Sequence, residues 1–269
     1  MNWLSKQASD TQITHGERIW LYLLVSIIMF LLIFPTLIVI PMSFSDSQYL
    51  EFPPKTWSFR WYNEYWETPR WINATLTSLK VAFFTMLLAT PFGTMAAYGL
   101  FVSGNKYSKY IFFLLMTPMI VPVILIAIGT FYAFGKVGIV NSIPGLVLAH
   151  TVLAIPIVMI IMTSALRTYD LNQELVARSL GASRLRAFYE ITLPQIKFSV
   201  ITSALLAFLT SFDEVIISIF LSGGGNSTLT KQMFNALRDY IDPTIAAIST
   251  LMILLSTTLM LGAQYVSKK

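Results

Sequence analysis

Residues 19–42 read IWLYLLVSIIMFLLIFPTLIVIPM, an apolar run without one charged side chain. A helix that crosses the hydrocarbon core of a bilayer needs about 20 such residues. The run is also longer than the apolar region of a secretory signal, which extends over about 7–15 residues before a small-residue cleavage site. The stretch is therefore predicted to be a transmembrane helix that the mature protein retains.

Five further stretches have similar length and character. The composition agrees with membrane insertion, because 55% of the 269 residues are hydrophobic and only 12% are charged, whereas soluble chains carry about 25% charged residues. The mean hydropathy is +0.68. The sequence thus predicts an all-α integral membrane protein with six transmembrane helices. The further spans are expected at 76–101, 111–134, 144–165, 198–221 and 244–265.

The distribution of Lys and Arg predicts the orientation, because the cytoplasmic loops of membrane proteins carry the excess of positive charge. It places residues 1–18 and a tail at 266–269 in the cytoplasm, on either side of a six-helix domain at 19–265. A long loop at 43–75 is then external, and a second one at 166–197 is cytoplasmic. The aromatic side chains of the external loop fit either an interfacial belt or a landing surface for an outside partner. The net charge of +5 is assigned to cytoplasmic segments rather than to nucleic-acid binding, since no basic cluster is visible.

The cytoplasmic loop contains the signals of two short amphipathic helices. Asp170 is expected to cap the N-terminus of the first helix, and Gly181 is expected to end that helix in a left-handed conformation. Ser183 is placed to cap the second, which is predicted to run through Glu190, and Pro194 opens the next membrane helix. Such a hairpin could equally lie on anionic lipid headgroups or bind in a pocket of a cytoplasmic protein.

This loop resembles the cytoplasmic loop of permease subunits in binding-protein-dependent ABC importers. In that family, Glu-Ala-Ala is followed by three residues, a glycine, nine residues and Ile-x-Leu-Pro. Here Gly181 is followed by nine residues and then by Ile-Thr-Leu-Pro. The opening differs, because the glutamate lies one place early and only the second alanine is present. The positions that the resemblance assigns to ATPase coupling are Glu174, Ala177, Gly181, Ala182, Ile191, Leu193 and Pro194.

Two carboxylates, Asp213 and Glu214, lie within the fifth apolar segment. Charges in a membrane segment are costly and usually face the protein interior or a cavity. On an uninterrupted helix, Ser211, Glu214 and Ser218 share one polar face, and Asp213 is rotated from Glu214 by about 100°. The carboxylates are either a structural pair, with Lys80 or a partner subunit, or a negative lining for a cationic substrate. We expect Asp213, Glu214, Ser211 and Ser218 to line a substrate pathway.

The segment Ser211-Phe212-Asp213-Glu214-Val215 resembles the second permease subunit of spermidine/putrescine importers and their relatives, which include opine importers. The resemblance extends over about residues 19–265. It implies a heteromeric complex in the bacterial inner membrane that imports polyamines by ATP-driven alternating access. The implied partners are a homologous second permease subunit, two ATP-binding subunits, a soluble substrate-binding protein and membrane lipid, with no nucleic acid and no cofactor.

Other functions fit the sequence less well. An opine or another amine-bearing metabolite is the nearest alternative cargo. A channel is disfavoured by the elaborate cytoplasmic loop, and an intramembrane enzyme by the divergence of two neighbouring carboxylates on a helix. The chain lacks a Gly-x-x-x-x-Gly-Lys-Ser/Thr phosphate loop, so ATP hydrolysis is expected in separate subunits. With two histidines in no metal-binding pattern and no cysteine, neither catalytic residues nor a metal site is predicted.

Overall fold

The computed structural model describes residues 14–267, with side chains up to residue 262. The predicted N-terminal segment as far as residue 13 and the end of the predicted tail, residues 268–269, lie outside the described residues. The regular elements of the described part are helices, which confirms the predicted all-α fold. They are α1 (Ile19–Met42), α2 (Arg60–Glu67), α3 (Pro69–Ser103), α4 (Ser108–Ile120), α5 (Val123–Val137), α6 (Ile143–Arg167), α7 (Asn172–Ser179), α8 (Arg184–Ala187), the π-helical turn η2 (Phe188–Thr192), α9 (Leu193–Phe212), α10 (Ile216–Leu221), the 3-10 turn η3 (Gly224–Asn226), α11 (Leu229–Asp239) and α12 (Thr244–Ser267).

Five helical runs in the described chain are long and apolar enough to cross a membrane: α1, α3, α6, α12 and the run from α8 through α9. A sixth is obtained when α4 and α5 are counted together, although they are bent by 97°. The bend interrupts the span predicted at 111–134. Val121 adopts an extended conformation (ψ 133°) because the residue before a proline is disfavoured in the helical region.

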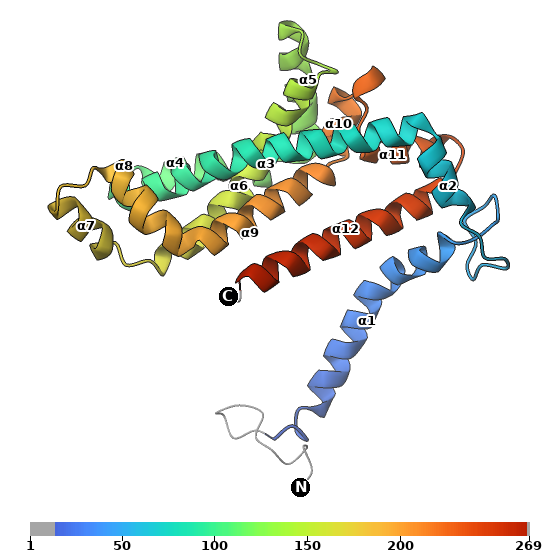
Figure 1. Ribbon diagram of the computed structural model, residues 1–269, viewed down its shortest axis with the longest axis horizontal. Coiled ribbons are helices and arrows are strands. Elements are labelled where there is room, and N and C mark those ends of the chain that lie inside the picture. Colours follow the sequence, from blue (N-terminus) through green and yellow to red (C-terminus); the bar gives the residue numbers. More distant parts are fainter. Residues whose placement is uncertain (1–13, 268–269) are drawn as a thin grey trace. The chain divides into compact units, whose positions relative to one another are not determined.

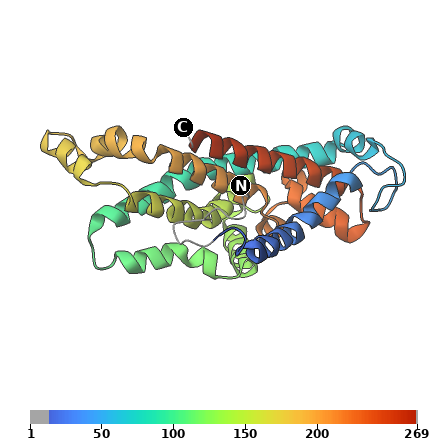
Figure 2. The same cartoon turned by 90° about the horizontal axis from the view of Figure 1, so that it is seen from below.

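The described chain divides into two compact units. One runs to Tyr65 and includes Ile241–Leu251, and the other contains Trp66–Tyr240 and the chain from Met252. In the second unit, α3, α6 and α9 lie side by side (Figure 1, Figure 2). Small residues let these helices approach closely. The buried side chains at their contacts are Ala89, Ala97, Ala154, Val158, Met162, Leu166, Ile196 and Ala207.

A further apolar cluster in the same unit joins α5 and α10 to α3 and α6. The Asn141 N–H, in the turn before α6, also donates to the Leu221 carbonyl at the end of α10, at 2.9 Å. The short helix α10 is therefore held by packing and by a backbone hydrogen bond. The buried members of the cluster are Val81, Ala127, Leu146, Val147, Ala149, Leu153, Ile217 and Leu221.

The first unit contains α1 and the folded loop that follows it. Hydrogen bonds from the Ser58 N–H to the Phe44 carbonyl (2.7 Å) and from the Asp46 N–H to the Thr56 carbonyl (3.2 Å) fold this loop back on itself. No residue of α1 is buried. An apolar helix that is exposed on all sides requires lipid or another subunit around it.

Candidate functional site

The chain between α6 and α9 begins with a hairpin of two helices, which we call the α7–α8 hairpin (residues 172–187). Asp170 precedes it, and its Oδ1 accepts the backbone N–H two residues further on at 3.0 Å. Gly181 turns the chain between the helices with a φ of +95°, a conformation that favours glycine. The Ser183 hydroxyl caps α8 by accepting the Arg186 N–H at 3.3 Å. The predicted helix–turn–helix is thus present, at one end of the α3–α6–α9 bundle (Figure 1, Figure 2).

The sequence predicted a second short helix that ends at Glu190, before the membrane helix begins. In the structure this helix continues into the membrane helix instead. Arg184–Phe212 is one helical run through the π turn. Pro194 explains this turn, because proline has no N–H and its ring clashes with the carbonyl four residues earlier in an α-helix. The wider turn lets the Leu193 N–H reach the Phe188 carbonyl instead. Ile191 therefore lies in the π turn, and Leu193 and Pro194 begin α9.

Large apolar side chains of the α7–α8 hairpin are exposed, next to the exposed Arg178 and Arg186. Leu180, next to the turn, is 85% exposed, and Leu185 and Val176 are 67% and 60% exposed. Ala177 and Ala182, two of the predicted coupling residues, are half-buried beside them. Large exposed apolar side chains that gather on one rigid element mark a contact surface rather than a solvated one.

Glu174, another predicted coupling residue, faces into the protein and is 1% exposed. The Tyr98 hydroxyl on α3 donates to Oε1 at 2.6 Å, and the Thr192 hydroxyl donates to Oε2 at 3.0 Å. The Tyr169 hydroxyl lies 3.1 Å from Thr192 Oγ1. We call these four residues the Glu174 cluster. Tyr98 was missed by sequence reasoning, because it lies 76 positions before Glu174 and no local pattern links them.

The fifth apolar segment is broken where its carboxylates lie. α9 ends at Phe212, and a separate helix, α10, follows. Glu214 Oε1 accepts the Ile217 N–H at 3.0 Å, and the Thr230 hydroxyl donates to the Glu214 carbonyl at 2.9 Å. Non-helical backbone within an apolar span is tolerated when its polar groups are satisfied in this way. The predicted helical face is therefore wrong for Glu214 and Ser218, because the helix does not continue past Phe212.

The expected pathway residues lie in different surroundings. Asp213 is exposed, and its side chain has neither a hydrogen bond nor an ion pair within residues 14–267. Ser211 is buried, and its hydroxyl lies 2.9 Å from His150 Nδ1. Ser218 is 0% exposed, and its hydroxyl lacks a partner in the described chain. Lys80 forms no ion pair with either carboxylate in that part of the chain, so the pairing with Lys80 considered from the sequence is absent there.

Residues 89–269 match the family model described as "Binding-protein-dependent transport system inner membrane component". The match includes the α7–α8 hairpin and the break between α9 and α10. The chain belongs to this family of permeases. The resemblance that rested on Gly181 and the Ile-Thr-Leu-Pro segment is thereby confirmed.

Comparison with individual proteins agrees. The permease is 30% identical over 235 residues to the spermidine/putrescine transport system permease protein PotC of Haemophilus influenzae, which covers 87% of this chain and 91% of that one. It is 31% identical over 208 residues to the putrescine transport system permease protein PotI of Escherichia coli, or 73% of each chain. It also shares its fold with a bacterial ABC transporter involved in the import of the acidic polysaccharide alginate, with a TM-score of 0.74 at 15% identity over 94% of this chain and 96% of that chain.

Family membership establishes the general role. The permease is a multi-pass inner membrane component of an ABC importer that works with a periplasmic binding protein. ATP hydrolysis takes place in separate subunits, so the permease is not itself an enzyme.

Proposed function

We propose that this permease imports polyamines or similar small organic cations, as one of two homologous permease subunits in a heteromeric complex. The observation that carries the proposal is Asp213, a carboxylate without a partner in the described chain, at the break between α9 and α10. The cargo class is supported by the relatives named for spermidine and putrescine transport.

Asp213 lies where two features stabilise a cation. The C-terminal end of a helix carries about half a negative charge, and Asp213 directly follows the last residue of α9. Broken helices line the substrate sites of many membrane transporters. Glu214 is engaged differently, since its carboxylate accepts the Ile217 N–H at the positive end of α10. We therefore assign cargo contact to Asp213 and fixation of the break to Glu214, while Ser211 and Ser218 are buried in the flanking helices α9 and α10.

The α7–α8 hairpin is proposed to dock on an ATP-binding subunit in the cytoplasm. The exposed side chains of Leu180 and Val176 and the sharp Gly181 turn support this assignment, because they give the hairpin a rigid end with exposed apolar side chains. Closure of two ATP-binding subunits then moves the hairpin, and α6 and α9, which flank it, carry the movement into the membrane as alternating access. In this arrangement both termini are cytoplasmic and the loop at 43–75 is external.

The cargo assignment is tested with Asp213→Asn in the reconstituted transporter, because the amide keeps the shape and removes the charge. At about 4 Å and an effective dielectric constant of about 20, the attraction to a cation is roughly 4 kcal/mol before desolvation is subtracted. Uptake of labelled putrescine should fall at least about tenfold, which requires only about 1.4 kcal/mol. Assembly with the ATP-binding subunits and basal ATP hydrolysis should be unchanged.

Glu214→Gln is the matched control. It removes the same charge one residue away, and it keeps an oxygen that can accept the Ile217 N–H. We expect a clearly smaller loss of uptake than with Asp213→Asn. Normal putrescine uptake by the double amide, with complete assembly, would contradict the proposed cargo.

A further inference from the structure

The α7–α8 hairpin is connected to the membrane helices in two different ways. α6 and α9 are joined to it through the chain itself, because α7 follows α6 and α8 runs into α9. α3 has no such link, since Tyr98 lies 76 positions before Glu174. A movement of the hairpin therefore reaches α3 through non-covalent contacts.

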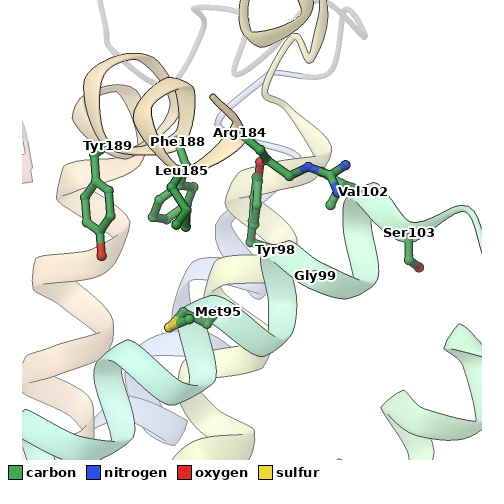
Figure 3. Close-up of a pocket in the computed structure, with 9 residues that line it drawn as sticks. All are labelled: Met95, Tyr98, Gly99, Val102, Ser103, Arg184, Leu185, Phe188 and Tyr189. Carbon is green, nitrogen blue, oxygen red and sulfur yellow. The ribbon is translucent and has the colours of Figure 1, made fainter. Parts of the chain in front are cut away.

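α3 packs along α6 and α9. Its direct contacts with the hairpin and η2 include those of Tyr98, in the last turns of α3 (Figure 3). Its hydroxyl donates to Glu174 of α7 at 2.6 Å. Its ring packs against Phe188 of η2, with centroids 4.6 Å apart and planes inclined by 53°. The Arg184 side chain of α8 lines the same groove as Tyr98 (Figure 3). One side chain of α3 thus contacts α7 and η2 and lies beside α8.

The Glu174 side of this contact is fixed at both oxygens. Oε2 accepts the Thr192 hydroxyl at 3.0 Å while Oε1 accepts Tyr98, so the carboxylate bridges α3 to the start of α9. A hydrogen bond in the low-dielectric interior is electrostatically stronger than the same bond in water. Packing on Tyr98 is one-sided by contrast, because a groove of about 300 Å³ opens beside its ring, along Gly99 and Leu185 (Figure 3). The hydrogen bond is therefore the contact that fixes Tyr98 relative to the hairpin.

We propose that Tyr98 is a positioning residue that transmits the ATP-driven movement of the α7–α8 hairpin to α3 through its hydrogen bond to Glu174. This inference rests on the proposed docking of the hairpin on an ATP-binding subunit. With the hydroxyl present, α3 and the hairpin move as one body. Without it, ATP hydrolysis continues while α3 follows the hairpin incompletely.

The test uses the complete transporter and spin labels on cysteines that replace Phe92 in α3 and Asn172 in α7. The chain has no cysteine of its own, and both side chains are exposed. With Tyr98 intact, the distance between the labels should stay constant when ATP is added. With Tyr98→Phe it should shift or broaden, and putrescine transported per ATP hydrolysed should fall at least about fivefold, the lower end of typical coupling between sites.

Two controls separate this role from general support of the fold. Tyr189→Phe removes a hydroxyl from the same groove, where the ring is 60% exposed, and should change neither readout. Glu174→Gln keeps an oxygen facing Tyr98 and should retain most of the coupling, whereas Glu174→Ala should lose at least as much as Tyr98→Phe, because it also removes the hydrogen bond from Thr192. The double variant Tyr98→Phe/Glu174→Ala should be no worse than Glu174→Ala alone, because the single variant already lacks the hydrogen bond to Tyr98.

Copurification of the ATP-binding subunits is measured on the same samples. Normal coupling and a constant label distance in Tyr98→Phe, with the subunits bound, would overturn the role of Tyr98 alone. Loss of the bound subunits in Tyr98→Phe would overturn it as well, because Tyr98 would then support docking rather than transmission. Absence of these subunits from the unsubstituted transporter would instead overturn the proposed docking itself.

Discussion

At Gly93, α3 and α6 approach more closely than a side chain permits. A Cβ at this position would lie 2.7 Å from Cβ and Cγ1 of Val158 and 3.2 Å from the Ile155 carbonyl oxygen. At Gly99, farther along the same helix, a Cβ would meet nothing within 4 Å. Replacing glycine by alanine gains about 1 kcal/mol of helix propensity at either position. The two glycines therefore form a matched pair in which packing alone differs.

Gly93→Ala is expected to destabilise the permease by about 1–3 kcal/mol, the usual cost of forcing extra volume into a packed contact. Gly99→Ala should be neutral or slightly stabilising. Thermal unfolding in detergent, compared as Tm, checks both variants. Equal Tm values for the two would show that α3 and α6 are not in close contact at Gly93.

Gly181 is constrained for a different reason. Its φ is +95°, and a Cβ there would meet nothing within 4 Å, so the cost of a side chain comes from the backbone conformation. Strain of this kind is roughly 1–3 kcal/mol, and it is greatest for β-branched residues. The permease should still insert, and the affinity for the ATP-binding subunits should decrease in the order Gly181, Gly181→Ala, Gly181→Val. Undiminished binding with valine would exclude Gly181 as the turn that shapes the docking surface.

Structural features that depend only on neighbouring residues were predictable from the sequence. The Gly181 turn and the Ser183 cap each depend on a few neighbouring residues, and both are present. The inward orientation of Glu174 was not predictable, because it depends on Tyr98 in a distant helix. The family pattern placed Glu174 in the right loop, but it could not identify what its carboxylate contacts.

At the scale of elements, apolar length predicts where a helix lies but not where it breaks. The spans expected at 111–134 and 198–221 are both interrupted, at Val121-Pro122 and after Phe212. A proline marks the first break, whereas the second depends on hydrogen bonds that distant Thr230 completes. Hydropathy averages over these positions, so it cannot distinguish a continuous span from a broken one.

Pro194→Ala tests the element that joins the hairpin to α9. The variant regains an N–H and relieves the ring clash, so the helix no longer needs the π turn at Phe188–Thr192. An α-helical turn holds one residue fewer than the π turn, so the α7–α8 hairpin would rotate by about 100° relative to α9. We expect Tm to rise or stay equal, whereas ATPase stimulation by the loaded binding protein falls. Unchanged stimulation would mean that the rotational setting of the hairpin has no role in coupling.

At the scale of the whole molecule, the surface of the chain requires other components. α1 has no buried residue, although it is apolar throughout. Lipid and neighbouring subunits must therefore cover surfaces that a soluble monomer would bury. Composition was sufficient to predict this class, because it sums over the whole chain. The cargo was suggested by family resemblance, and its proposed contact is a single side chain, Asp213, so it requires the uptake measurements described above.

The predicted orientation and the proposed docking are testable together in this cysteine-free chain. Tyr49 and Leu180 are suitable positions, because they are 77% and 85% exposed. In intact cells, a membrane-impermeant maleimide should label Tyr49→Cys and leave Leu180→Cys unmodified. In permeabilised membranes without the ATP-binding subunits, Leu180→Cys should react readily, because its environment is then open to water.

Adding the ATP-binding subunits back should slow the labelling of Leu180→Cys and leave that of Tyr49→Cys unchanged. The reason is steric, since in the proposed arrangement a docked subunit covers Leu180 of the α7–α8 hairpin and lies across the membrane from the loop at 43–75. Labelling of Leu180→Cys in intact cells would reverse the orientation. Equal labelling rates with and without the subunits, in membranes where copurification shows them bound, would place their docking site away from Leu180.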